Sequence, residues 1–167
     1  MWTISLTLEK KFMKTIALFT LMIIGQLSFA QKAPMTWYTD INEASAIAKK
    51  ENKPMMLFFT GSDWCGWCHR LQNEVFKTPE FEKWAKENVI LVELDFPRSK
   101  PQTEAIKVQN RGLQQQFGVR GYPTCWFVKP EKMSDGKMNL TQLGSKGYEA
   151  GGPANWINGA NTMIHPN

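Results

Sequence analysis

Apolar and polar positions change their spacing several times along this chain of 167 residues, and each change marks a predicted element. Continuous apolar runs predict strands buried on both faces of a sheet over 55–60 and 89–96. Apolar stripes three and four residues apart predict helices over 40–52, 65–76, 78–88, 102–117 and 153–163. Shorter runs of strand-forming residues predict strands over 34–39, 124–129 and 138–144, with a turn over 130–137.

Several predicted helices have residues at their ends that favour those positions. Asp40 is a good N-cap, and Glu43 follows it at the spacing of a capping box. Thr78 is a second N-cap, with Pro79 at the first helical position. Gly118 supplies a C-terminal stop for the long polar helix before it. These residues set the helix boundaries independently of the apolar spacing.

The order of the predicted elements determines the expected fold class. Strands and helices alternate through most of the chain, and the last two strands follow each other directly. Alternation of this kind predicts an α/β layer with parallel strands, and the final pair predicts an antiparallel hairpin. The length favours one domain. The long polar helix is expected to bury only Ile106, Leu113 and Phe117.

The first thirty residues have the pattern of a signal peptide rather than of a folded element. Three lysines between positions 10 and 14 precede an apolar run over 15–27, and small residues flank the position after Ala30. We expect cleavage after Ala30, with Met13 as a better-proportioned start than Met1. A retained membrane anchor is the alternative, although the run is short for a full span.

Charge and cysteine content narrow the class of protein. The net charge is +5, and it falls to +3 without residues 1–30, because that segment holds three lysines and one glutamate. No basic run with interleaved aromatic residues is present, so we expect no nucleic-acid partner. Three cysteines are too few for a disulfide-stapled scaffold, and the domain over 31–167 is large enough to fold without one. The cysteines are therefore available for chemistry.

Two of the cysteines form a C-x-x-C pair where a predicted strand gives way to a helix. Cys65 lies at the expected helix N-terminus, where free N–H groups and the helix dipole stabilise a thiolate. The pKa of a free cysteine, about 8.5, falls to about 3.5–7.5 at such sites. We interpret Cys65 as the exposed attacking thiol and Cys68 as the resolving thiol of thiol–disulfide exchange.

Other interpretations of this pair are a static disulfide, a metal site and a haem site. Cys65 to His69 also fits C-x-x-C-H, the attachment motif of c-type haem, although a buried strand directly before the motif speaks against it. One C-x-x-C with two distant histidines, His69 and His165, does not make a zinc site. We therefore predict no metal and no cofactor.

Two motifs together resemble the thioredoxin superfamily. These are Trp64-Cys65-Gly66-Trp67-Cys68 and Val119-Arg120-Gly121-Tyr122-Pro123-Thr124, and the element order matches over nearly all of 34–164. The resemblance implies a thioredoxin fold, with a central mixed β-sheet flanked by helices on both faces in three layers, α/β/α. It also implies that Pro123 follows a cis peptide bond and lies beside the cysteines, where the backbone of Tyr122 aligns a substrate strand.

The resemblance extends to a substrate groove, for which we expect Trp64, Gly66, Trp67, Gly121, Tyr122, Pro123 and Thr124. Trp64 and Trp67 flank the thiols and are expected to form an exposed apolar patch. His69 and Asp63 are candidates for tuning the cysteine pKa, His69 favouring the thiolate when protonated and Asp63 opposing it. An exposed histidine without a role is the alternative for His69.

Three features depart from the family pattern or lie outside it. Thioredoxins usually carry a buried acid six residues before the first cysteine, and this chain has Phe59 there. The central pair Gly66-Trp67 is closer to secreted Dsb-type proteins than to reducing thioredoxins, which leaves the redox direction open. Cys125 is expected to be an inert core thiol, and a third redox thiol is the alternative.

The sequence as a whole predicts an exported thiol–disulfide oxidoreductase, periplasmic or secreted. Its expected partners are disulfide- or thiol-containing envelope proteins and a membrane redox partner, and we expect a monomer. Contact with the membrane is expected only through the signal segment if it stays uncleaved. The alternatives are a c-type haem protein and a non-catalytic binding module on the same fold.

Overall fold

The structure is a computed structural model that describes residues 35–132 and 138–166. The predicted signal segment, its cleavage after Ala30 and the alternative start at Met13 lie outside these residues. Within the described ranges, every helix is too short or too polar to cross a lipid bilayer.

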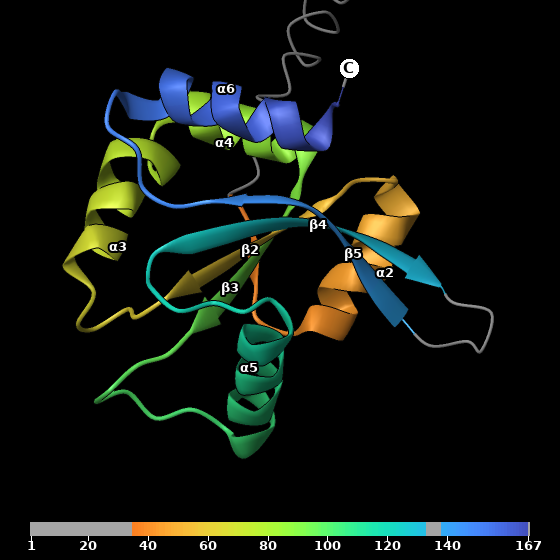
Figure 1. Cartoon of the computed structure of the whole chain (residues 1–167), viewed down its shortest axis with the longest axis vertical. Helices are drawn as coiled ribbons and strands as arrows, with labels where there is room; N and C mark the ends of the chain where they lie inside the picture. Colours follow the sequence, from red (N-terminus) through yellow and green to blue (C-terminus); the bar gives the residue numbers. More distant parts are fainter. Residues whose placement is uncertain (1–34, 133–137, 167) are drawn as a thin grey trace, which may run out of the picture. The chain divides into compact units, whose positions relative to one another are not determined.

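Five strands form one mixed sheet in the order β1-β3-β2-β4-β5 (Figure 1). They are β1 (Trp37–Tyr38), β2 (Met55–Thr60), β3 (Ile90–Asp95), β4 (Thr124–Lys132) and β5 (Met138–Lys146). The first three are mutually parallel, while β4 runs antiparallel to β2 and β5 antiparallel to β4. The predicted parallel layer with a terminal antiparallel hairpin is therefore confirmed.

Helices cover both faces of the sheet (Figure 1). One face carries α2 (Ile41–Glu51) and α5 (Glu104–Gln116). The other carries α3 (Gly66–Leu71), the π-helical turn η1 (Gln72–Phe76), α4 (Pro79–Asn88) and α6 (Gly152–Ile164). The arrangement is the three-layer α/β/α fold expected from the sequence.

Strand β2 lies at the centre of the sheet, and both of its faces are buried. Met56 and Phe58 pack under α3 and α6, whereas Leu57 and Phe59 pack against α2 and α5. All its residues are buried because helices cover both sides. This burial accounts for the unbroken apolar run, which an exposed face would have interrupted with polar residues.

The predicted helix ends are formed by the expected side chains. The Asp40 carboxylate accepts hydrogen bonds from two N–H groups in the first turn of α2, and the Thr78 hydroxyl accepts one in α4. Gly118 has a φ of 59°, the left-handed conformation that ends the helix α5. Local chemistry therefore determines these boundaries.

Several details differ from the prediction: β1 begins only at Trp37, β5 continues to Lys146, and the helix predicted over 65–76 is α3 followed by η1. The turn expected over 130–137 begins later, because β4 continues through Pro130 to Lys132. Pairing with β2 ends at Val128, so Pro130 has a strand neighbour on one side only, where a missing N–H is tolerated. On α5, Ile106 is half-buried and not buried as predicted. The prediction also overlooked Asn110, which is fully buried and donates its amide to the Asp95 carbonyl at 2.9 Å.

Candidate functional site

Cys65 and Cys68 are joined by a disulfide at the point where β2 gives way to α3. A turn folds the chain here, with the Cys65 amide donating to the Gly61 carbonyl at 2.9 Å. Cys65 caps the helix, since its Sγ accepts a hydrogen bond from the Cys68 amide at 3.2 Å. After reduction, the same amide would favour the thiolate of Cys65 over its thiol.

The two sulfur-bearing residues differ in their access to solvent. Cys68 is fully buried, whereas Cys65 keeps 5% of its surface exposed. Cys65 is thus much less exposed than the sequence suggested, but it remains the one of the pair that another molecule can reach. Cys68 faces the core between α3 and the sheet.

Trp64 directly precedes Cys65 and is half-buried. Its Nε1–H donates to the Phe96 carbonyl at 2.8 Å, and its ring meets Tyr122 edge to face with centroids 5.6 Å apart. The guanidinium of Arg98 lies over the same ring, 4.2 Å from the centroid. Trp64 is therefore a fixed wall of the site, and only part of it belongs to the exposed patch predicted from the sequence.

Trp67 lies between the two cysteines in the chain and is 56% exposed, as the predicted patch requires. Its ring packs against Tyr148, with centroids 5.4 Å apart, and Arg70 lies over both rings. Arg70 also bonds Glu74 at 2.6 Å. Hydrogen bonds from Tyr148 and then Arg70 lower the pKa of Glu74, so this cluster holds an ionised carboxylate.

The loop before β4 lies at the same end of the sheet as the disulfide. The peptide bond between Tyr122 and Pro123 is cis. The Thr124 hydroxyl donates to the Gly121 carbonyl at 2.8 Å, and Thr124 itself pairs with Phe59 of β2. The contact between Trp64 and Tyr122 then brings this loop against the cysteine loop.

Asp63 and His69 are held by backbone groups close to the cysteines. Asp63 accepts hydrogen bonds from the Ser99 hydroxyl and from the Arg98 and Ser99 amides, which lower the pKa of its carboxyl far below the ordinary value. His69 is exposed, with Nε2–H donating to the Ser62 carbonyl at 3.0 Å. Asp63 thus anchors the loop after β3 as well as carrying a negative charge.

Gly66 completes the predicted groove. It is exposed, and a Cβ added there would meet no atom within 4 Å. The position directly after Cys65 is therefore open to an approaching molecule.

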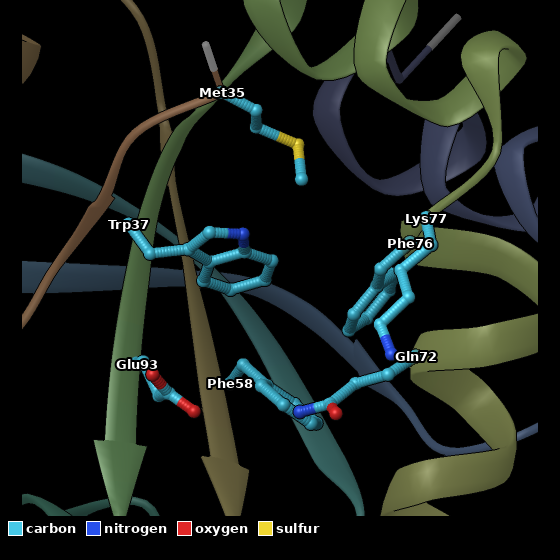
Figure 2. Close-up of a pocket in the computed structure, with 7 residues that line it drawn as sticks. All are labelled: Met35, Trp37, Phe58, Gln72, Phe76, Lys77 and Glu93. Atoms are coloured by element: carbon cyan, nitrogen blue, oxygen red, sulfur yellow. The ribbon is translucent and has the colours of Figure 1, made fainter.

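A pocket of about 180 Å³ lies on the α3 face of the sheet, beside η1 (Figure 2). Its lining consists of Met35, Trp37, Phe58, Gln72, Phe76, Lys77 and Glu93. Glu93 is half-buried, and its burial, followed by the nearby Asp95, raises the pKa of its carboxyl. Phe59, which stands where thioredoxins usually carry a buried acid, lies on the opposite face of the sheet. Glu93 therefore does not occupy the place of that acid, but it is a desolvated carboxyl on the face that carries α3.

Glu93, Arg98 and Tyr148 shape this region but were overlooked in the sequence. Glu93 interrupts an otherwise apolar strand, a signal that could have been noticed. Arg98 and Tyr148 follow β3 and β5 in irregular segments, and only tertiary contacts bring them to the two tryptophans. No periodic pattern marks either residue.

Cys125 is a free thiol in the core. It is fully buried on β4, opposite Phe58 of β2 and Lys146 of β5. Burial raises the pKa of its thiol well above the ordinary value. This environment fits the inert thiol predicted from the sequence, since a neutral buried thiol is a poor nucleophile.

In 35–132 and 138–166, no three His, Cys, Asp or Glu side chains are grouped so that they could hold an ion.

Comparison with known proteins places the motifs in a family. Residues 36–130 match the family model described as Thioredoxin-like. "Disulfide bond reductase DsbH" of Chlamydia pneumoniae is 38% identical over 115 residues, which are 69% of this chain and 64% of that protein. "Thioredoxin-related protein DsbJ" of the same organism is 32% identical over 70% of this chain.

A solved structure titled "DsbH Oxidoreductase" superposes with a TM-score of 0.70 and 32% identity, covering 85% of this chain and 92% of its own. The match to the curated relatives is partial. The chain spans 64% of the length of the first relative and 32% of the second.

Proposed function

This chain belongs to the thioredoxin-like family, and we propose that it is an exported thiol–disulfide oxidoreductase that acts on envelope proteins through Cys65 and Cys68. The observation that carries the proposal is the asymmetry of the pair. Cys65 caps a helix, accepts an N–H bond and keeps some exposed surface, whereas Cys68 is sealed behind it. That asymmetry suits an attacking thiol and a resolving thiol.

The reaction proceeds through a mixed disulfide. The Cys65 thiolate attacks one sulfur of a substrate disulfide, and the other substrate sulfur leaves as a thiolate that takes up a proton. The Cys68 thiolate then attacks the Cys65 sulfur, forming the Cys65–Cys68 disulfide and releasing the second substrate thiolate. Two electrons pass from the dithiol to the substrate, and the reverse sequence oxidises a substrate dithiol.

We propose the reducing direction, which the printed name of the relative "Disulfide bond reductase DsbH" supports. A reductase in an oxidising compartment has to be re-reduced after each turnover. A membrane-bound thiol donor is the partner that we propose for this step.

The substrate lies along the loop that carries Tyr122 and Pro123, between Trp64 and the exposed Trp67. Tyr122 supplies backbone groups to an extended substrate strand, and Pro123 adds no competing N–H donor. Gly66 leaves the approach to Cys65 open, and Gly121 and Thr124 hold the loop in place.

The two alternative functions, a c-type haem protein and a non-catalytic binding module, would use the two sulfurs differently. Covalent haem attachment through C-x-x-C-H would need both sulfurs as thioethers, and Cys68 faces the core. A non-catalytic binding module would keep its activity without either cysteine. An absorption spectrum of the purified protein, with or without a Soret band, distinguishes the haem alternative.

Trapping of the mixed disulfide tests the function. We expect Cys68→Ser to accumulate a covalent complex with a disulfide substrate, because Cys65 attacks and no resolving thiol follows. Cys65→Ser should trap none, and Cys125→Ser should turn over like the parent protein. Equal trapping by the Cys65 and Cys68 variants, or none by either, would overturn the proposal.

The reduction potential of the Cys65–Cys68 pair checks the direction of the reaction. A reductant has a potential near about −270 mV, and an oxidant has one near about −120 mV.

Export is tested by fractionating cells that make the full chain. We expect a form that starts at Gln31 outside the cytoplasm. An intact chain starting at Met1 or Met13 in the membrane fraction would instead support the retained anchor.

A further inference from the structure

We infer that Arg98 recognises a carboxylate close to the reacting cystine of the substrate, so that the protein prefers acidic substrate segments. The inference rests on the proposed function and names the substrate class of the same site.

The position of the Arg98 guanidinium suggests this role. It lies over the indole of Trp64, 4.2 Å from the ring centroid, and Trp64 directly precedes Cys65 in the chain. Stacking uses the flat face of a guanidinium and leaves the N–H groups at its edge free. Those groups match a carboxylate in a two-pronged hydrogen bond. A substrate carboxylate close to the cystine could meet them over the side chain of the residue that precedes Cys65.

The backbone of Arg98 is fixed before any substrate arrives. Asp63 accepts the Arg98 amide at 3.0 Å and the Ser99 amide at 2.7 Å. On the other side of the loop, the Phe96 carbonyl accepts the Trp64 Nε1–H at 2.8 Å. Asp63 of the cysteine loop thus holds the backbone that carries the cation, and Phe96 of the loop after β3 holds the ring beneath the cation. Little conformational entropy remains to be lost when a ligand binds.

The charge balance around Trp64 is positive. Arg98, Lys100 and Arg120 form no ion pair with any carboxylate in the described part of the chain. Lys100 instead donates to the Ser62 hydroxyl at 3.0 Å, and Arg120 is exposed just before the proline loop. Asp63 and Asp95 are the acidic groups of this side, and both already accept hydrogen bonds, Asp63 from the loop after β3 and Asp95 from Ser62. The surface therefore complements a negative ligand.

The Trp67 side does not offer the same site. Arg70 bonds Glu74 at 2.6 Å, and Glu74 also accepts from the Tyr148 hydroxyl. The charge of Arg70 is matched within the protein, while that of Arg98 is not. This difference assigns carboxylate recognition to the Trp64 side.

Matched peptides test the preference. Three peptides carry the same mixed disulfide and differ only in the residue next to the half-cystine, which is Glu, Gln or Lys. We expect the reduced full chain to react about two- to fivefold faster with the Glu peptide than with the Gln peptide, the range of one partly exposed ion pair. The Lys peptide should be slower still. The preference should fade at 1 M salt, where the Debye length is about 3 Å.

Variants locate the effect. Arg98→Gln should bring the Glu-to-Lys rate ratio close to one, and Arg98→Lys should retain part of it. Arg111→Gln, which removes an exposed charge on α5, should leave the ratio unchanged. An unchanged ratio in Arg98→Gln, or equal rates with all peptides in the parent protein, would overturn the inference and leave the proposed function standing. If no peptide reacts at all, the proposed function is wrong and the inference falls with it.

Discussion

The rings of Trp64 and Tyr122 meet edge to face, 5.6 Å apart between centroids, and so join the cysteine motif to the proline motif. The two motifs are separated in sequence by η1, α4, β3 and α5. Their contact at one end of the sheet depends on the parallel pairing of β2 with β3 and the antiparallel pairing of β2 with β4. The site is consequently as well ordered as the sheet beneath it.

Gly61 leaves the space in which the Trp64 indole lies. A Cβ at this position would overlap the Cε2, Nε1 and Cζ2 atoms of that indole. We expect Gly61→Ala to displace the indole, to lower the free energy of unfolding by about 1–3 kcal/mol as overpacking does, and to slow disulfide exchange. Urea denaturation and an exchange assay measure the two effects.

Gly112→Ala is the matched control, because a Cβ on that glycine of α5 meets no atom within 4 Å. It should instead stabilise the protein by about 0.5–1 kcal/mol, the usual gain from replacing glycine inside a helix. Equal effects of the two substitutions would contradict the steric explanation.

Glu93→Gln should change how stability depends on pH. Burial raises the pKa of Glu93 in the folded protein, so the native state holds this proton more tightly than the unfolded chain does. The resulting stabilisation is complete below the unfolded glutamate pKa, about 4.3, and is lost as pH rises through the folded value. We expect the stability of Glu93→Gln relative to the parent protein to increase between about pH 4 and pH 7.

Glu104→Gln is the control for this measurement of stability against pH, because the pKa of Glu104 is shifted in the opposite direction. Lys107 lowers the pKa of Glu104, so its small stabilisation is present at neutral pH and is lost as pH falls. Unfolding curves at several pH values compare the two variants. A pH-independent difference between Glu93→Gln and the parent protein would argue against burial of the charge.

Cys125 should be chemically silent in the folded protein. We expect a thiol reagent to label nothing in the oxidised native chain and to label this cysteine after unfolding, because the thiol is fully buried. Labelling is followed by mass spectrometry with and without denaturant. Rapid labelling of native Cys125, or a Cys65–Cys125 disulfide during turnover, would restore the third redox thiol as an explanation.

Lys146 should contribute to stability although it carries a charge in the core. Its ammonium donates to the Trp156 carbonyl at 2.8 Å and to Glu149 at 3.0 Å, and it lies over the Trp156 ring. We expect Lys146→Met to cost about 1–3 kcal/mol, because the buried carbonyl loses its donor. Thermal unfolding monitored by tryptophan fluorescence measures the loss. A gain in stability would show that desolvation of the ammonium outweighs its hydrogen bonds.

Helix ends and strands that are determined by neighbouring residues in the chain were predictable from the sequence. The N-caps Asp40 and Thr78, the stop at Gly118 and the fully buried β2 each follow from neighbouring residues. The two motifs that resemble thioredoxins also carried enough information for the fold. The positions of these elements therefore needed no tertiary information.

Features that depend on distant partners were not predictable. The length of β4 beyond Pro130 depends on where pairing with β2 ends. The burial of Asn110 depends on the Asp95 carbonyl, and the position of Arg98 depends on Asp63 and Trp64. No spacing rule encodes these contacts, since each joins segments from different elements.

The groups around the cystine come from connections that follow or precede a strand and from helix α3, while the strands themselves fill the interior. Natural variation in those connections can thus alter selectivity or redox behaviour without disturbing the hydrophobic framework. A laboratory library restricted to 61–67, 96–100 and 119–123 would explore the same freedom. The hydrophobic core and the sheet would stay unchanged while the variants are selected for new exchange partners.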